Sequence, residues 1–237
     1  METQIGKMPE LLPEDVIERA KRLNPALLCD GMKDMGVVMD GCMEAAIMPV
    51  GPTQELCMAG TAITVETDKG DNFPIHVATY SALPGYVMVI DGKGYTERPY
   101  FGDLIMGAAK AVGLEGMVVD GYCRDKAGCL ALGLPVFSRG QLQRGVVKKE
   151  PGRINQPIVC GGVDVKPGDL VIGGADGVTV VPREIVYEVL ERAEEKQAYE
   201  RKRETAIAAY VEAAEHGKPL PQLAPQWVLD LLDSKAK

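Results

Sequence analysis

Residues 102–125 read GDLIMGAAKAVGLEGMVVDGYCRD, and this stretch passes from a helix pattern to a strand pattern. Residues 102–112 carry apolar side chains at helical spacing, and the apolar run 117–119 is bounded by glycine on one side and by Asp120-Gly121 on the other. A turn then presents Arg124 and Asp125 side by side. A helix, a strand and a turn in this order are typical of an α/β protein.

The alternation of patterns extends in both directions from this stretch. Helices are predicted for residues 13–23, ended by Pro25, for a short segment from about Asp30 to Met35, and for residues 73–82. Residues 41–60 are rich in glycine, proline and methionine and are expected to form a loop. Besides 117–119, short strands are predicted for residues 61–65, 86–90, 135–138, 157–160, 170–172 and 178–181. We therefore expect a compact α/β domain with more than one sheet layer.

The C-terminal part of the chain has a different character. Residues 182–215 contain no glycine and no proline after Pro182, and 13 of the 22 residues from Arg183 to Glu204 are charged. At about 1.5 Å per residue such a helix is roughly 50 Å long, more than the width of a domain of this size. We expect it to leave its own domain and to pack on a neighbouring subunit, although a solvated helix with a purely structural role remains open. A further amphipathic segment covers residues 226–232.

Composition excludes several classes of protein. The chain has 237 residues, 46% hydrophobic and 25% charged, with a formal net charge of −8. These values are not those of a disordered chain, and an acidic balance disfavours generic binding to nucleic acid. No run approaches about 18 consecutive apolar residues, so no membrane contact is expected. Without a signal-peptide pattern at the N-terminus, we expect a soluble cytoplasmic protein.

Histidine and cysteine usage limits the kind of metal site. The six cysteines form no C-x-x-C pair and are expected to be free thiols, and there are only two histidines, His76 and His216. A metal site must therefore rest on carboxylates, which favours Mg²⁺ or Mn²⁺ over zinc.

The start of the 102–112 helix and the Arg124-Asp125 pair indicate a small anionic ligand. The first amides of a helix have no partner within it and carry a partial positive charge, so those of Asp103, Leu104 and Ile105 could hold a carboxylate. Arg124 offers a planar fork for a keto or carboxylate oxygen, and Asp125 can bind a divalent cation that keeps most of its waters. Together these groups predict a site for a small 2-oxo acid. Each also has an explanation without a ligand, as a surface ion pair or as a helix cap.

Asp103, twenty further residues and Arg124-Asp125 resemble the D-x20-R-D signature of the metal-dependent 4-hydroxy-4-methyl-2-oxoglutarate / 4-carboxy-4-hydroxy-2-oxoadipate aldolases. These enzymes share a fold with the RraA-like regulators of ribonuclease activity. The resemblance covers about residues 30–203 and includes Asp71-Asn72, Pro84-Gly85, Gly113-x-x-Gly116, Asp120-Gly121, Pro135-Val136-Phe137, Gly161-Gly162, Pro167-Gly168-Asp169, Asp176-Gly177-Val178 and Val181-Pro182. It implies an RraA-like swivelling β/β/α-type fold, layered α-β-β-α, with a catalytic domain over residues 1–181 and a helical extension over 182–237.

The resemblance also implies a role for each candidate residue. Arg124 would bind the pyruvyl moiety of the substrate, and Asp125 would hold Mg²⁺, Mn²⁺ or Co²⁺. The amides around Gly102 to Leu104 would bind the substrate carboxylate. Asp103, coupled to His76, would position a water that delivers or removes a proton. Without the resemblance, a lone histidine of this kind is more often a hydrogen-bonded core residue.

The resemblance also implies that the long C-terminal helix contributes a glutamate to the site. In aldolases of this type such a residue reaches the metal waters of an adjacent subunit, and Glu200 in the sequence Glu200-x-x-Arg203 best fits that position. The family resemblance therefore implies a homotrimer, or a homohexamer made of two trimers.

Position 128 departs from the aldolase pattern. The pattern continues R-D-x-x-E/D, whereas this chain reads Arg124-Asp125-Lys126-Ala127-Gly128, so the outer acidic group is missing and a lysine stands close to the expected metal.

Two functions of different classes follow. The first is a divalent-metal-dependent pyruvate aldolase, a carbon–carbon lyase that cleaves a 4-hydroxy-2-oxo acid to pyruvate and decarboxylates oxaloacetate through the same enolate. The second is an RraA-like regulator that binds a ribonuclease through surface contacts and performs no catalysis. The long C-terminal helix favours the enzyme, because close RraA-type regulators usually lack it.

Overall fold

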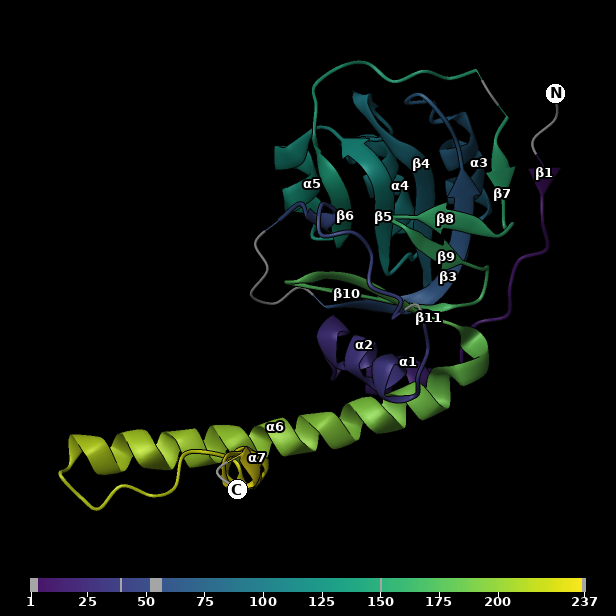
Figure 1. Ribbon diagram of the computed structural model, residues 1–237. Helices are drawn as coiled ribbons and strands as arrows, with labels where there is room; N and C mark the ends of the chain where they lie inside the picture. The colour runs from purple at the N-terminus through teal and green to yellow at the C-terminus, as the bar shows by residue number, and fades with distance from the viewer. Residues whose placement is uncertain (1–3, 39, 52–56, 150, 236–237) are drawn as a thin grey trace. The chain divides into compact units, whose positions relative to one another are not determined.

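The computed structural model describes residues 4–38, 40–51, 57–149 and 151–235. Figure 1 shows the arrangement of its elements. In chain order they are β1 (Gln4–Ile5), α1 (Glu14–Ala20), α2 (Pro25–Asp34), β2 (Met48–Pro49), β3 (Met58–Glu66), α3 (Phe73–Ser81), β4 (Tyr86–Pro99), α4 (Asp103–Ala111), β5 (Gly116–Cys123), α5 (Lys126–Leu132), β6 (Val136–Gln141), β7 (Arg153–Ile154), β8 (Ile158–Cys160), β9 (Val163–Val165), β10 (Leu170–Gly174), β11 (Gly177–Val181), the 3₁₀ helix η1 (Arg183–Ile185), α6 (Val186–Glu215) and α7 (Gln226–Lys235).

The main sheet is built on four parallel strands, β3, β4, β5 and β6, which are neighbours in that order. The helices α3, α4 and α5 connect them, so the chain forms three successive β-α-β units. β7 and β10 pair antiparallel with the other edge of β3, and β2 pairs with β6. The α/β class predicted from the alternating patterns is confirmed.

Both faces of the parallel strands are buried, which sets up four layers. In β4, Met88 and Ile90 join the apolar cluster under α3 and α4, whereas Val87 and Val89 join a second cluster with β8, β9 and β11. Alternate residues of a strand point to opposite faces, so a strand covered on both sides is apolar throughout. A third cluster lies between β10 and the helices α1, α2 and the start of α6. The order is α, β, β, α, as the resemblance implied.

Pro25 begins a helix here, whereas the sequence predicted that it ends one. α1 covers Glu14–Ala20 within the predicted range, but α2 begins at Pro25 and not near Asp30. Proline suits the first turn of a helix because its missing N–H needs no partner there. The side chain of Asn24 completes the start, since its Oδ1 accepts a hydrogen bond from the Leu27 amide at 3.0 Å.

β4 extends well beyond the predicted strand 86–90. The register with β5 shifts between Ile90 and Tyr95 and again between Tyr95 and Pro99. Lys93 and Gly94 have left-handed backbones, with φ of 56° and 65°. The Asp91-Gly92 pair therefore marks a bulge and not the end of the strand. This irregular continuation carries the chain to the start of α4.

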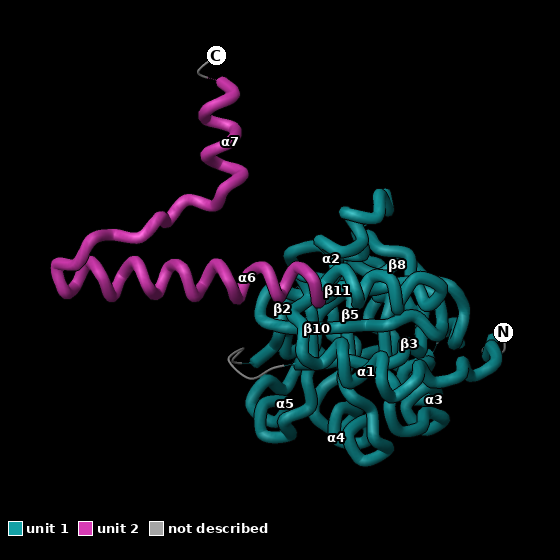
Figure 2. Tube along the Cα trace, turned by 90° about the horizontal axis from the view of Figure 1, so that it is seen from below, with its two compact units in different colours: residues 1–193 teal, residues 194–237 magenta. Residues whose placement is uncertain are grey.

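The long C-terminal helix is confirmed as α6, and α7 coincides with the predicted amphipathic segment. The described chain divides into two compact units, residues 1–193 and 194–237 (Figure 2). Val186, Val189 and Ala193 at the start of α6 are buried in the first unit. In the second unit, the Arg203 side chain donates to the Leu223 carbonyl at 2.8 Å. Of the helices in the described ranges, none has the length and apolarity needed to cross a membrane.

Candidate active site

The carboxyl ends of β4 and β5 bring the two halves of the predicted signature together. β5 ends immediately before Arg124-Asp125, and α4 begins at Asp103 shortly after β4. The Arg124 amide donates to the Phe101 carbonyl at 2.9 Å and so fastens the two segments to each other. The carboxyl edge of a parallel sheet is where α/β proteins usually bind ligands.

Arg124 and Asp125 form an ion pair in which Nε of Arg124 lies 3.1 Å from Oδ2 of Asp125. Their side chains are 35% and 39% exposed, so both remain open to a ligand from solvent. Asp125 has a left-handed backbone with φ of 58° and occupies the N-cap position of α5. This conformation is uncommon outside glycine but is tolerated by aspartate and asparagine. The chain thus turns sharply at the pair.

Gly102 leaves the space that the Asp125 carboxylate occupies. A Cβ at position 102 would lie 2.2 Å from Oδ2 of Asp125 and 3.0 Å from Cγ of Arg124. The φ of Gly102 is −140°, an extended value that any residue adopts. The need for glycine here is therefore one of space and not of backbone conformation.

The first turn of α4 presents unpaired amides beside this pair. The Met106 amide makes the first bond of the helix, to the Gly102 carbonyl at 3.1 Å, and no side chain of the described residues caps the start of the helix. The amides of Asp103, Leu104 and Ile105 therefore precede the first hydrogen-bonded turn. Such amides favour an anion in front of the helix.

The Arg124-Asp125 pair and the first turn of α4 line one small cavity. Its volume is about 80 Å³, and it is lined by Asn72, His76, Gly102, Asp103, Leu104, Ile105, Arg124, Asp125, Val146 and Lys148. Seven of the eight residues singled out from the sequence are among them. The eighth, Glu200, is exposed on the part of α6 that belongs to the second unit and is not one of the lining residues.

Comparison with known proteins identifies the family. A family model described as RraA-like (Aldolase/RraA) matches residues 25–180. The chain belongs to the RraA-like family. A protein of Halalkalibacterium halodurans, provisionally named 4-hydroxy-4-methyl-2-oxoglutarate aldolase, is 43% identical over 171 residues, which are 72% of this chain and 80% of that protein.

Solved structures show the same fold. A protein of Pseudomonas syringae pv. tomato is 26% identical with a TM-score of 0.72, over 86% of this chain and 92% of that one. Streptomyces coelicolor RraAS2, described as an unusual member of the RNase ES inhibitor RraA family, is 22% identical with a TM-score of 0.73, over 81% and 98% of the two chains. At that identity the second likeness concerns the fold alone.

Gly128 leaves space for the side chain of Asp103. A Cβ at this position would lie only 2.4 Å from Oδ2 of Asp103. The Asp103 carboxylate therefore rests against α5 in the space where the aldolase pattern has an acidic side chain. A side chain at position 128 would therefore displace the Asp103 carboxylate from the place that it occupies here.

Three lining residues escaped the sequence analysis: Asn72, Val146 and Lys148. Val146 and Lys148 belong to a segment without a helical or strand pattern, which gave no signal. Asn72 was noted only as part of the resemblance, although its side chain is informative. It is 3% exposed, and its Oδ1 has no hydrogen-bond partner among the described residues. A buried acceptor of this kind is expected to meet a donor on a bound molecule or water.

His76 belongs to α3 and lines the same cavity as Lys148. Burial lowers the pKa of His76 below its usual value, and the positive charge of Lys148 lowers it further. The neutral imidazole is therefore favoured, which leaves one ring nitrogen able to accept a proton.

Replacing Lys148 by glutamine is expected to raise the pKa of His76, because one of the two causes of its depression is removed. The measurement is an NMR titration of the imidazole signals, which is simple in a chain with two histidines. Lys149→Gln is the matched control, since Lys149 lines a different cavity and its loss should leave the titration of His76 unchanged. A pKa of His76 that does not move in Lys148→Gln would contradict this electrostatic coupling.

The donor set fits a sparsely liganded magnesium ion. Within the described residues there is no group of three His, Cys, Asp or Glu side chains placed to hold a metal. The carboxylates of Asp103 and Asp125 nevertheless line the same cavity. Magnesium is commonly held by one or two carboxylates, keeps several waters and takes further ligands from a substrate. A closed zinc site of four protein ligands does not fit these residues.

Proposed function

We propose that this chain is a divalent-metal-dependent aldolase that cleaves a 4-hydroxy-2-oxo acid, such as 4-hydroxy-4-methyl-2-oxoglutarate or 4-carboxy-4-hydroxy-2-oxoadipate, to pyruvate. The observation that carries the proposal is the meeting of Arg124, Asp125 and the first turn of α4 around one cavity. These groups match the carboxylate and keto oxygen that every such substrate shares. Membership of the RraA-like family and the name of the H. halodurans relative support the same reaction.

The first turn of α4 and Arg124 would bind the pyruvyl end of the substrate. The amides of Asp103, Leu104 and Ile105 would hold the carboxylate, and the Arg124 guanidinium would donate to the keto oxygen. Cleavage between C3 and C4 places negative charge on that oxygen as the enolate of pyruvate forms. A fixed guanidinium beside it stabilises this charge at no cost of reorganisation.

Asp125 is the residue that would hold Mg²⁺, Mn²⁺ or Co²⁺. When bound, such an ion supplies Lewis-acid stabilisation of the same developing charge. The left-handed backbone of Asp125 and the ion pair with Nε of Arg124 together fix the position of the Asp125 carboxylate.

Proton transfer is assigned to groups on two sides of the cavity. Asp103 and the neutral His76 would hold the water that protonates C3 of the enolate. Glu200 from a second copy would accept, through water, the proton of the C4 hydroxyl. This role requires a homotrimer or a homohexamer, which we include in the proposal. Oxaloacetate should lose CO₂ at the same site, because that reaction passes through the same enolate.

The test is release of pyruvate from 4-hydroxy-4-methyl-2-oxoglutarate and from oxaloacetate, with added Mg²⁺ and with a chelator. We expect turnover with the metal and its loss with the chelator. Arg124→Gln is expected to lower kcat/KM about a hundredfold, or ~3 kcal/mol, because one fixed donor to the developing charge is removed. The absence of metal-dependent pyruvate release from the wild-type chain would exclude the aldolase and favour a non-catalytic binding protein.

A further inference from the structure

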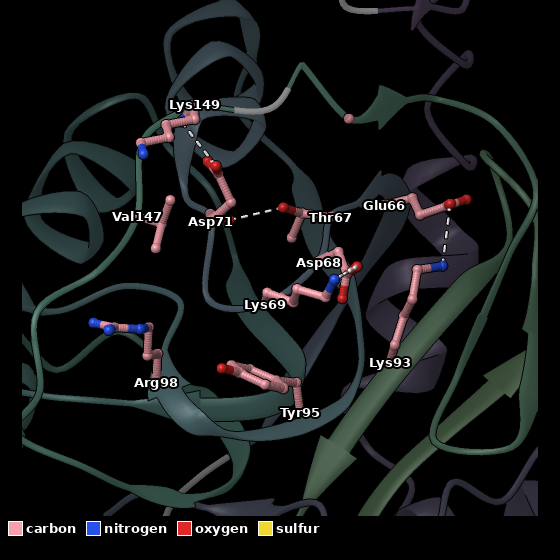
Figure 3. Close-up of a pocket in the computed structure, with 11 residues that line it drawn as sticks. Glu66, Thr67, Asp68, Lys69, Asp71, Lys93, Tyr95, Arg98, Val147 and Lys149 are labelled. Atoms are coloured by element: carbon pink, nitrogen blue, oxygen red, sulfur yellow. Dashed lines mark hydrogen bonds and ion pairs between the residues drawn. The ribbon is translucent and has the colours of Figure 1, made fainter.

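A second cavity lies behind the wall of the first. It has a volume of about 600 Å³ and is enclosed by the end of β3, the following turn, β4 and the segment before β7 (Figure 3). The segment 146–149 separates the two cavities, since Val146 and Lys148 line the first whereas Val147 and Lys149 line the second. Val147 pairs with the turn in parallel fashion, donating to the Gly70 carbonyl at 2.9 Å.

Positive side chains outnumber negative ones around this second cavity. Lys69, Lys93, Arg98 and Lys149 line it, together with Glu66, Asp68 and Asp71. Arg153, which pairs with Glu66, and Asp91, which pairs with Lys93, add one charge of each sign. The local excess is one positive charge, in a chain whose net charge is −8. An acidic protein that keeps a positive cavity attracts anions to that place.

The carboxylates of the cavity are already engaged. Glu66 receives Lys93 Nζ at 3.1 Å and also the guanidinium of Arg153. Asp71 is 1% exposed, and its two oxygens accept from the Phe73 amide at 2.9 Å and from the Lys149 amide at 2.8 Å. The oxygens of both carboxylates therefore have hydrogen-bond or ion-pair partners within the walls of the cavity.

Arg98 and Lys149 keep donors available. One guanidinium nitrogen of Arg98 donates to the Gly145 carbonyl at 3.1 Å, and the others make no hydrogen bond or ion pair with described residues. The ammonium group of Lys149 has no such partner within the described ranges either. Figure 3 shows these two side chains on one side of the cavity with Val147 between them. Lys69 lies near the middle of the view beside Asp68, and the two charged groups are 4.0 Å apart in a loose, exposed pair.

Tyr95 adds an apolar surface at the base of this wall. Its ring is half-buried and lines the cavity, and its hydroxyl donates a long hydrogen bond of 3.4 Å to the Glu97 carboxylate. A cavity of several hundred Å³ with one aromatic face and a few convergent charges is typical of sites for small organic ligands.

We propose that this second cavity binds a phosphate ester of a small organic molecule, independently of the reaction proposed for the first. The phosphate would lie in the cavity against the wall that carries Arg98 and Lys149, whose fork and point charge suit its oxygens and whose combined charge matches a dianion. The organic part would pack on Tyr95. A neutral molecule would leave the cations unmatched, and a single carboxylate would match only one of them.

Isothermal titration calorimetry on the full chain tests the proposal, at low ionic strength and with a chelator present so that no turnover occurs. The probes are adenosine 5′-monophosphate, ribose 5-phosphate and glycerol 3-phosphate, with adenosine and citrate as comparisons. We expect at least one ester to bind with a stoichiometry of one per chain and to weaken as salt is added. The double variant Arg98→Gln/Lys149→Gln should weaken that binding at least tenfold.

Matched variants separate this cavity from other causes. Lys149→Gln alone breaks no hydrogen bond of its side chain to the described residues and should weaken binding at least threefold. Lys33→Gln, which removes the same charge from an exposed position on α2, and Arg124→Gln should leave the affinity unchanged. Failure of all three esters to bind, unaltered affinity in the double variant, or equally tight binding of citrate or adenosine would overturn the proposal, whatever the outcome for the aldolase.

Discussion

Asp125→Asn is expected to reduce metal-dependent pyruvate release to the uncatalysed rate. The substitution removes the negative charge that would hold the divalent ion and leaves the rest of the cavity in place. Asparagine tolerates the left-handed backbone observed at this position, so the turn between β5 and α5 should persist. The measurement is kcat/KM for both substrates over a range of Mg²⁺ concentrations.

The fold of this variant needs its own control, because a loss of activity is informative only in a folded protein. The Asp125 side chain is 39% exposed, and its ion pair with the neighbouring Arg124 is exposed to solvent, so thermal unfolding and the circular dichroism spectrum should match those of the wild type. An Asp125→Asn protein that retains full metal-dependent activity would show that the ion, if used, is held elsewhere.

Gly102→Ala is expected to lower kcat/KM a hundredfold or more, although the change adds a single methyl group. The new Cβ would lie 2.2 Å from Oδ2 of Asp125, so the carboxylate must rotate away, and Arg124 is crowded as well. Displacing reacting groups by about 1 Å can cost on the order of a hundredfold in rate. The extended φ of Gly102 is compatible with alanine, so the protein should fold.

Gly107→Ala in the same helix is the matched control for this prediction. A Cβ there meets nothing closer than the Leu132 side chain at 3.8 Å, an ordinary contact. Activity should be unchanged, and stability should stay the same or rise by up to ~1 kcal/mol because alanine favours the helix. Equal activity of the two alanine variants would refute a role for the space at position 102.

The strands were predictable where an apolar run ended in a turn signal. The segments that escaped prediction lack such a run: β1, β2 and β7 have two residues each, β9 has three with Asp164 in the middle, and α5 has seven and contains a glycine. β2 lies within residues 41–60, which were predicted to be a loop. Elements this short are fixed by tertiary contacts rather than by local pattern. Pro25 was assigned wrongly because proline can follow the end of one helix or open the next, and the Asn24 cap shows that here it opens α2.

The site was predictable as far as its residues are close along the chain or joined by adjacent parallel strands. Asp103 and Arg124-Asp125 follow neighbouring strands, so their meeting follows from topology. Lys148 lines the same cavity but belongs to a segment without a helical or strand pattern. Backbone hydrogen bonds hold this segment against the turn after β3, and bonds of this kind do not depend on side-chain type and so could not be predicted from the sequence. Glu200 belongs to the second compact unit, and its assigned role remains a prediction.

Because residues 146–149 separate the two cavities, the side chains that line each cavity depend on the length of the loop that precedes this segment. Successive side chains of this extended segment face opposite cavities, Val146 and Lys148 the first and Val147 and Lys149 the second. The position of a lysine along the segment therefore determines which cavity it lines. Inserting or deleting one residue just upstream would exchange the two sets of side chains, as a slipped strand does. In relatives whose loop is one residue longer or shorter, the side chains of this segment that line each cavity would differ from those seen here. The charges around both cavities would then change without any substitution among the other lining residues.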